Sequence, residues 1–278
     1  MYLRVQAYAQ YHFIYRESQR PGVRHTRPLS CQLMSVIARF PPEDAVLCAE
    51  CAVLRDDYDV MLEVMDVHLR GKERERARSG LALVAFECRR WACLLELAKR
   101  DVWPFGPGME LVDVSREFAE TVGMWGKAEL AELLLRARPD LRLPLVLAAV
   151  KCGNVACLAR IREHVLLCGE VATRAAVEVG RMDSLEHLHN AGCAWNASAT
   201  YAAADKGRLE LLKYLHQAGC PWDRDATYAA ARMGHLECLK YLHEQGCPWD
   251  ETTLYSAARM GHVECVEYLR EQGCPEPL

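Results

Sequence analysis

The sequence has no marked excess of either charge and no long apolar run. Its 34 lysines and arginines nearly balance its 38 aspartates and glutamates, which gives a formal net charge of -4. Because binding to a phosphate backbone normally needs a strong basic excess, this balance argues against nucleic acid as the partner. No apolar run approaches the ~20 residues that cross a bilayer, so we expect no membrane-spanning segment.

Motifs for secretion, cofactor binding and catalysis are also missing. The N-terminus lacks a basic stretch followed by an apolar segment and a small-residue cleavage site, so we expect no secretion. The chain contains no glycine-rich phosphate loop, no nucleophile motif and no HExxH zinc motif. The sequence therefore predicts a protein that is not an enzyme and that uses no small-molecule substrate and no cofactor.

Cysteine, in contrast, is abundant, with 14 residues. An even number of cysteines is typical of the disulfide frameworks of small secreted domains. This chain is 51% hydrophobic, has no secretion signal and can build an ordinary core, so we expect mostly reduced thiols. Reduced thiols indicate a cytoplasmic or nuclear protein or, for a viral protein, the cytoplasm of the host cell.

Three segments near the C-terminus align without a gap from residue 193 onward. They read CAWNASATYAAADKGRLELLKYLHQAG, CPWDRDATYAAARMGHLECLKYLHEQG and CPWDETTLYSAARMGHVECVEYLREQG, each 27 residues long. Steps of 27 connect six glycines and three tryptophans, namely Gly126, Gly153, Gly180, Gly207, Gly234 and Gly261, with Trp195, Trp222 and Trp249. A fixed period of this length is typical of a repeat array.

The pattern continues upstream with less regularity. Residues 83–100 match it if Arg89 takes the place of the turn glycine. The charged stretch 68–80 and the Pro/Gly-rich stretch 102–108 would then be solvated loops between units. We therefore expect an N-terminal extension or cap at 1–44, degenerate helix pairs with loop inserts at 45–109 and six repeats of 27-residue period at 110–278.

Each unit has the pattern of two short helices. Residues 225–233 are Ala-rich and favour a helix, and Gly234 supplies the positive φ that ends it. Residues 235–245 carry a helical-period apolar stripe and stop at Gly246. The expected N-caps of the first helices are Ser198, Asp225 and Thr252. Because two short helices cannot close a core alone, the units must stack into an all-α solenoid of helix-turn-helix repeats.

These residues resemble a known repeat family. The segment AAARMGHLECLKYLHEQGC (229–247) is similar to the core of an ankyrin repeat, with its Ala-Ala pair, Gly-His turn and Leu-rich second helix. An ankyrin repeat has about 33 residues, so the shorter unit implies a truncated β-turn finger. The Gly-Cys-Pro-Trp-Asp connector is similar to those of ankyrin arrays found in giant viruses of amoebae and in some protists.

The resemblance implies a non-enzymatic scaffold that binds a protein partner, whose identity the sequence does not give. On a fixed scaffold, specificity should lie where equivalent exposed positions differ between units. These positions are Ala197, Arg224 and Glu251, then Asp205, Arg232 and Arg259, then Lys206, Met233 and Met260. We expect them to form parallel rows along one helical face.

A metal site is suggested by His235, Cys238, His243 and Cys247, which are all ligand-capable. The preceding unit keeps only half of this set, which a metal that built each unit would not tolerate. Stacked helices also lie ~8–10 Å apart, too far for ligands from neighbouring units to converge. We therefore expect no metal, and interpret Cys238 as a core residue and His235 and His262 as turn-capping groups.

The repeated tryptophans allow two interpretations. They could form an exposed aromatic strip that grips a partner, or they could cover the interhelical core in place of a finger. Their regular repetition at the connector favours the second interpretation. The cysteines that keep the same step should be buried and unpaired, because equivalent Cα atoms one repeat apart exceed the ~7 Å limit for a disulfide. They are Cys193, Cys220, Cys247 and Cys274.

Two other function classes stay open. Residues 1–40 are rich in arginine and aromatics, which fits a cap or extension better than a nucleic-acid or targeting role. Some arrays of this kind carry an F-box that recruits a ubiquitin ligase; residues 35–54 do not match it closely, so a ubiquitin-ligase adaptor stays an alternative. A self-associating structural array is the other, because Val263, Val266 and Leu269 have no further repeat to cover them.

Overall fold

The computed structural model describes residues 49–50, 52–54, 58–68, 75–104 and 112–276. The chain folds as two compact units, residues 1–118 with 133–139, and residues 119–132 with 140–278. The two units are described separately. The expected domain limits after residues 44 and 109, like the N-terminal extension, lie outside the described residues.

The first unit contains α4 (Tyr58–His68), α5 (Glu75–Glu87) and α6 (Trp91–Lys99), with α6 packed against both of the others. Arg89 lies in the turn between α5 and α6 with φ 56, the left-handed conformation that a glycine would adopt. The expectation of a loop over residues 68–80 is wrong for residues 75–80, which begin α5. Arginine, glutamate and alanine favour a helix, and here this propensity prevails over the high charge.

The second unit is built from consecutive helix pairs. After α7 (Val112–Met124) and α8 (Ala128–Ala137), which contribute to both units, the elements are η2 (Pro139–Leu141), α9 (Arg142–Cys152), α10 (Val155–Arg160), α11 (Arg162–Leu166), α12 (Gly169–Val179), α13 (Met182–Ala191), α14 (Ala197–Asp205), α15 (Leu209–Gln217), α16 (Arg224–Arg232), α17 (Leu236–Glu244), α18 (Glu251–Met260) and α19 (Val263–Glu271). No strand occurs among the residues that the structure describes.

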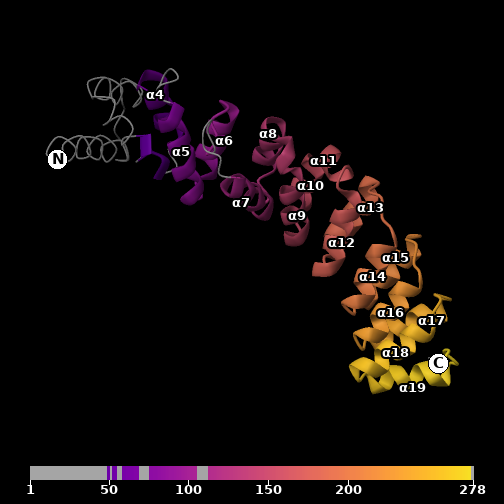
Figure 1. The fold of residues 1–278 in the computed structure, drawn as a ribbon. Coiled ribbons are helices and arrows are strands. Elements are labelled where there is room, and N and C mark those ends of the chain that lie inside the picture. Colours follow the sequence, from indigo (N-terminus) through magenta and orange to yellow (C-terminus); the bar gives the residue numbers. More distant parts are fainter. Residues whose placement is uncertain (1–48, 51, 55–57, 69–74, 105–111, 277–278) are drawn as a thin grey trace, which may run out of the picture. The chain divides into compact units, whose positions relative to one another are not determined.

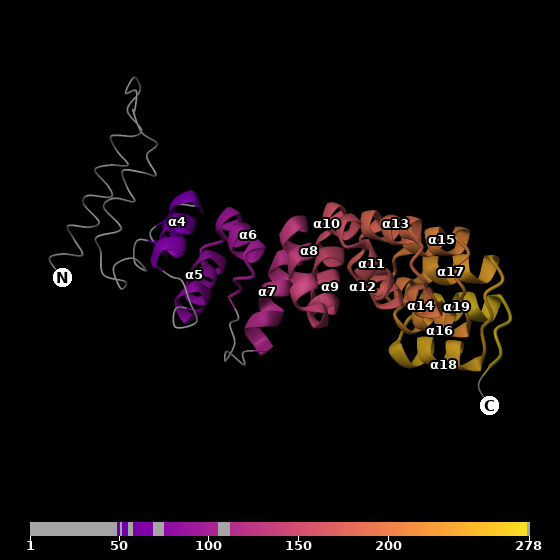
Figure 2. The same ribbon diagram turned by 90° about the horizontal axis from the view of Figure 1, so that it is seen from above.

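The helix pairs stack in two layers. The first helices α9, α12, α14, α16 and α18 pack in this order, and in the second layer α10 packs on α13, and α17 on α15 and α19. Figure 1 shows α14, α16 and α18 on one side of the stack and α15, α17 and α19 on the other, and Figure 2 shows the same layers from above. The predicted all-α solenoid is confirmed.

The two layers bury side chains of different size, small ones on the first helices and large ones on the second helices. Ala203 and Ala230 on the first helices are fully buried, as are Leu212 and Leu239 on the second helices. Alanine lets the first helices approach closely, and leucine fills the space between the layers. Each connector, such as the one between α17 and α18, runs without a strand, so the finger is absent from the C-terminal repeats.

The turn glycines are needed for two separate reasons. All six aligned glycines have positive φ, between 62° and 85°. A Cβ on Gly207 would lie 2.6 Å from Nδ1 of His235, and a Cβ on Gly234 would lie 2.5 Å from Nδ1 of His262. The glycine therefore permits the left-handed backbone and also makes room for the imidazole of the next repeat.

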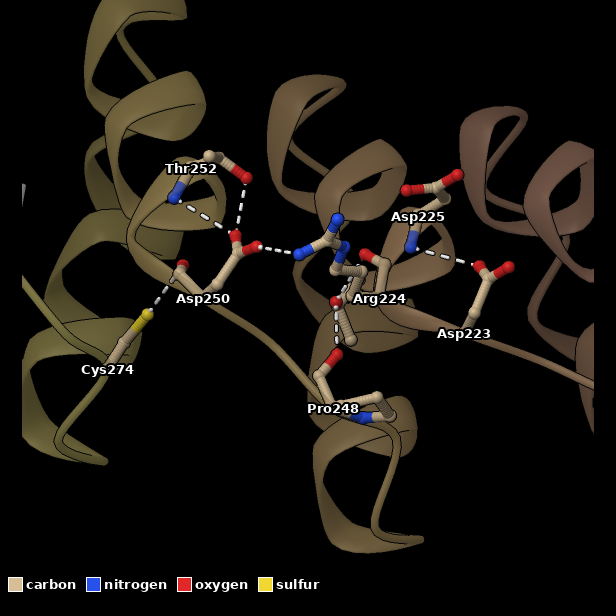
Figure 3. Close-up of polar contacts among 8 residues, drawn as sticks. Asp223, Arg224, Asp225, Pro248, Asp250, Thr252 and Cys274 are labelled. Atoms are coloured by element: carbon tan, nitrogen blue, oxygen red, sulfur yellow. Dashed lines mark hydrogen bonds and ion pairs between the residues drawn. The ribbon is translucent and has the colours of Figure 1, made fainter.

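The first helices of the last three repeats have side-chain N-caps. An oxygen of Asn196, Asp223 or Asp250 accepts a hydrogen bond of 3.0 Å from the backbone N–H two residues later. The two aspartates are seen in Figure 3. The later residues, Ser198, Asp225 and Thr252, were the expected N-caps, and that expectation is wrong by two positions. Ser, Asp and Thr also occur within the first helical turn, so residue type alone does not fix the boundary.

Two glycine substitutions separate the two roles of glycine. Gly246 also has positive φ, 83°, but a Cβ there would meet nothing within 4 Å. We expect Gly246→Ala to lower the free energy of unfolding by about 1 kcal/mol, the cost of the left-handed backbone. Gly234→Ala should lower it by a further ~1–2 kcal/mol, because the alanine also displaces His262 from its hydrogen bond. Urea unfolding measures both, and equal losses would contradict the steric role.

Candidate functional site

The residue after each turn glycine reaches back to the preceding repeat. Nε2 of His235 donates to the carbonyl of Asp205 at 3.1 Å, and Nε2 of His262 donates to that of Arg232 at 3.0 Å. Both acceptors lie at the end of a first helix, where carbonyls have no partner within the helix. The predicted turn-capping role of His235 and His262 is confirmed, with the cap extended to the neighbouring repeat.

Other donors take the same position in the earlier repeats. Nε of Arg181 donates to the carbonyl of Lys151 at 3.1 Å, and Nδ2 of Asn154 donates to that of Gly123 at 2.8 Å. Histidine, arginine and asparagine therefore make the same contact in different repeats: each donates to a carbonyl at the end of the preceding first helix.

The connectors are also bound to their neighbours. The Thr227 hydroxyl lies 2.8 Å from the carbonyl oxygens of Arg224 and Pro248. The Cys247 thiol donates to the carbonyl of Asp223 at 3.2 Å, and burial raises the pKa of this thiol to about 12. The four repeated cysteines are buried and unpaired, which confirms the prediction. They are structural groups, since burial also raises the pKa of the Cys193, Cys220 and Cys274 thiols, and a thiol with a raised pKa is a poor nucleophile at neutral pH.

The tryptophans stack on histidines of the second helices. The ring centroids of Trp222 and His216 lie 3.9 Å apart, as do those of Trp249 and His243. Nδ1 of His243 lies 2.9 Å from the hydroxyl of Tyr268 in the next repeat. The half-buried indoles are therefore engaged within the array, which supports the structural interpretation of Trp195, Trp222 and Trp249.

The four residues of the suspected metal site have other partners. His235 caps a helix, His243 stacks on an indole, Cys247 donates to a carbonyl and Cys238 is buried in the core. In the part of the chain that the structure describes, no three His, Cys, Asp or Glu side chains are grouped as metal ligands. The described helices include none that is long and apolar enough to span a membrane.

The expected partner-binding residues lie at the two ends of the first helices. The row Ala197, Arg224 and Glu251 begins α14, α16 and α18, and the row Asp205, Arg232 and Arg259 lies eight residues later. Eight residues on a helix span about 12 Å, so these rows are the two edges of one surface. Lys206, Met233 and Met260 follow at the C-terminal edge, all exposed.

A row of tyrosines lies between the two edges. Tyr201, Tyr228 and Tyr255 are four residues from each edge row, and this spacing places all three rows on one side of the first helices. Tyr255 is 53% exposed and the other two are half-buried. From the sequence these tyrosines are expected to be core or rim residues, and because they are identical in all three units, variation between units does not select them as binding residues; the four-residue spacing is the available signal. We call these three rows, with Lys206, Met233 and Met260, the first-helix face.

Part of the first-helix face is occupied by contacts between repeats. Asp205 accepts from Arg232 at 2.6 Å and pairs with Lys206 at 3.1 Å. A second contact joins the Arg224 guanidinium to Asp250 at 3.2 Å, as Figure 3 shows. Exposed residues such as Glu251, Arg259 and Met260 complete the surface. The face therefore combines residues held by these ion pairs with exposed charged and apolar side chains.

The repeat geometry agrees with comparisons to known proteins. Residues 199–276 match the family model of ankyrin repeats, in three copies. This part of the chain is therefore similar to ankyrin repeats. Among curated proteins, none matches the chain significantly. The human ASB11 ankyrin repeat domain is a similar solved structure, with 21% identity, a TM-score of 0.45, and coverage of 56% of this chain and 84% of that one. Ankyrin repeats are generally protein–protein interaction modules and typically not enzymes.

The Asp205 contacts predict a pH-dependent contribution to the stability of the repeats. Burial alone would raise the pKa of Asp205, but hydrogen bonds from Lys206 and Arg232 hold this pKa below its usual value. A lowered pKa stabilises the fold above the unfolded value of ~3.9, and this contribution is lost as the pH falls through the folded value.

We therefore expect Asp205→Asn to lower the free energy of unfolding by about 1 kcal/mol at pH 7, since Arg232 is partly exposed. The difference from wild type should disappear as the pH falls from the unfolded value of ~3.9 through the lowered folded pKa of Asp205. Asp225→Asn, which removes an exposed carboxylate, is the matched control. Denaturant unfolding across this pH range measures the effect, and a pH-independent loss would show that the carboxylate charge contributes nothing.

Proposed function

We propose that this chain is a non-enzymatic scaffold that binds a protein partner through its first-helix face. The observation that carries the proposal is the pattern on that face, where Tyr201, Tyr228 and Tyr255 repeat while the residues at both edges differ between units. A constant framework with variable exposed side chains is what recognition of a particular partner requires.

The chemistry of the face suits a protein surface. Tyrosine combines a large apolar ring with a hydroxyl, and it is enriched where proteins bind one another. Neighbouring first helices lie ~8–10 Å apart, so the three tyrosines span about 20 Å. A partner that contacts the row and both edges therefore extends across three repeats, which suits a protein surface better than a compact small ligand.

The cysteines and the repeat pattern bear on the location of this scaffold and on its relatives. We propose a cytoplasmic or nuclear location on the basis of the free cysteines. The 27-residue period and the Gly-Cys-Pro-Trp-Asp connector support a relation to the short-repeat arrays of giant amoebal viruses and protists. The adaptor alternative depends on residues 35–54, which fall almost wholly outside the described residues.

Affinity capture with a face variant tests the proposal. The triple variant Glu251→Arg, Tyr255→Ala and Arg259→Glu alters exposed residues of a single repeat. The control exchanges the charges of the Glu237–Lys240 pair on α17, in the second layer. We expect proteins captured by the full wild-type chain to be depleted about tenfold or more by the face variant, by quantitative mass spectrometry, because charge and a tyrosine anchor are both lost.

The control variant should retain the captured proteins. Depletion by the control, with full retention by the face variant, would place binding on the second layer and refute the proposal. Circular dichroism of both variants separates lost binding from lost folding.

Self-association is a second candidate, favoured by the end of the array. Ala258 is exposed, whereas the equivalent Ala231 is fully buried by the next repeat. Gly261 has nothing within 4 Å of its Cβ position, and Val263 is 63% exposed. Of the residues expected to be uncovered there, Val266 is only partly exposed and Leu269 is buried, because Leu269 faces its own first helix. A further helix pair from a second copy would cover the exposed positions.

Light scattering against concentration tests this candidate. If the array end self-associates, the weight-average mass should rise with concentration in the wild-type chain. The double variant Ala258→Arg and Val263→Glu should keep the mass at that of the monomer, because buried unpaired charges are strongly unfavourable. A constant monomer mass up to ~1 mM would eliminate self-association at this surface.

A further inference from the structure

The turns between first and second helices carry half of the positive charges of the last three repeats but few of the negative ones. We call turn ridge the four residues from two before to one after each turn glycine, that is 151–154, 178–181, 205–208, 232–235 and 259–262. Among residues 193–276, four of the eight lysines and arginines lie on this ridge, but only one of the twelve acidic residues, Asp205. The four cations are Lys206, Arg208, Arg232 and Arg259.

An apolar row runs beside these cations. The position directly before the turn glycine holds Val179, Met233 and Met260, which are 42%, 40% and 56% exposed. Met233 and Met260 lie in register in adjacent repeats, whereas Lys206 separates them from Val179. Contiguous exposed apolar surface with charged residues beside it is typical of a binding surface.

The carbonyl groups at the C-terminal ends of the first helices do not need these cations as capping groups. The last carbonyls of a first helix carry partial negative charge and usually attract lysine or arginine. Here His235 and His262 already donate to the carbonyls of Asp205 and Arg232. Asp205 neutralises part of the charge of Lys206 and Arg232, which leaves Arg208 and Arg259 as exposed cations of the ridge.

The rest of these repeats is acidic. On α19 alone, Glu264, Glu267 and Glu271 are exposed, and the whole chain has a net charge of -4. The positive charge of the turn ridge is therefore a local feature, and an acidic ligand would be attracted to the ridge and repelled from the second layer.

We propose that the turn ridge binds an extended acidic segment of a partner protein, with aliphatic side chains between its carboxylates. This inference rests on the proposed function and extends the C-terminal edge of the first-helix face to the turns themselves. The carboxylates pair with the ridge cations such as Arg259, and the aliphatic groups contact Met233 and Met260.

The spacing of the repeats sets the pattern of the ligand. Equivalent ridge positions are ~8–10 Å apart, as are the stacked helices that carry them. An extended chain in the polyproline II conformation rises about 3.1 Å per residue and has three residues per turn, so every third residue lies on the same side and meets an equivalent position. The matching segment therefore has an acid and an aliphatic residue once in each triplet.

A synthetic peptide tests the proposal directly. The probe is a fluorescein-labelled peptide of four Asp-Ser-Leu triplets, titrated with the full chain and followed by fluorescence anisotropy. We expect saturable binding that weakens as salt is added, because exposed charge pairs are screened. Peptides of four Lys-Ser-Leu triplets and of four Asp-Ser-Ser triplets should bind at least about tenfold more weakly, since one lacks the charge and the other the apolar groups.

Matched variants locate the binding. Arg208→Glu with Arg259→Glu should reduce affinity for the acidic peptide about tenfold or more. Met233→Ser with Met260→Ser should reduce it about fivefold and leave the salt dependence unchanged. The control, Lys213→Glu with Lys240→Glu, makes the same charge change on α15 and α17 and should alter affinity less than about twofold. Thermal melts of all three establish that they fold.

Three results would overturn the inference. They are equal losses in the ridge and control charge variants, no binding of the acidic peptide, and preferential binding of a single-stranded oligonucleotide. If the acidic peptide fails while captured proteins still depend on the first-helix face, the ridge inference is wrong and the proposed function stands. If the captured proteins are also indifferent to the face variant, both are wrong.

Discussion

The structure depends on one requirement, that the open carbonyls at the end of each first helix find donors. A helix this short cannot satisfy them within itself, and in this array the donor comes from the following repeat, as with His235 and His262. That donor must pass over the turn, which leaves no space for a side chain at Gly207 or Gly234. The period, the glycine and the two-layer stack therefore all serve this capping, because the helix-end carbonyls of one repeat are bound by the next repeat.

The same requirement divides the surface into fixed and variable parts. The connector is held by Thr227 and Cys247, and the second layer by the stacks of histidine on tryptophan, so these residues recur from repeat to repeat. Residues that take part in none of these contacts, such as Glu251 and Met260, can change without loss of stability. Variation is thereby concentrated on the first-helix face and the turn ridge, where a partner would be recognised.

The period and its glycines made the fold predictable, because a left-handed turn at fixed spacing admits few alternatives. Arg89 could be aligned with the glycines and indeed has positive φ. The N-caps were misplaced because capping residues also occur inside the first turn, at Ser198 and Asp225. The tyrosine row could have been found from its four-residue spacing. The pairing of Arg232 with Asp205 depends on which side chains meet across repeats, and a single sequence does not contain that distance.

The caps that cross from repeat to repeat also bear on how such an array can change length. Every such bond in the last repeats joins only adjacent units, as those of His262 and Cys274 do. Loss or duplication of one complete 27-residue segment would therefore bring together two surfaces that already fit, with each donor still opposite an acceptor. The fold accordingly tolerates unequal recombination between near-identical segments. The array can gain or lose whole repeats, and so change length, without changes to its core.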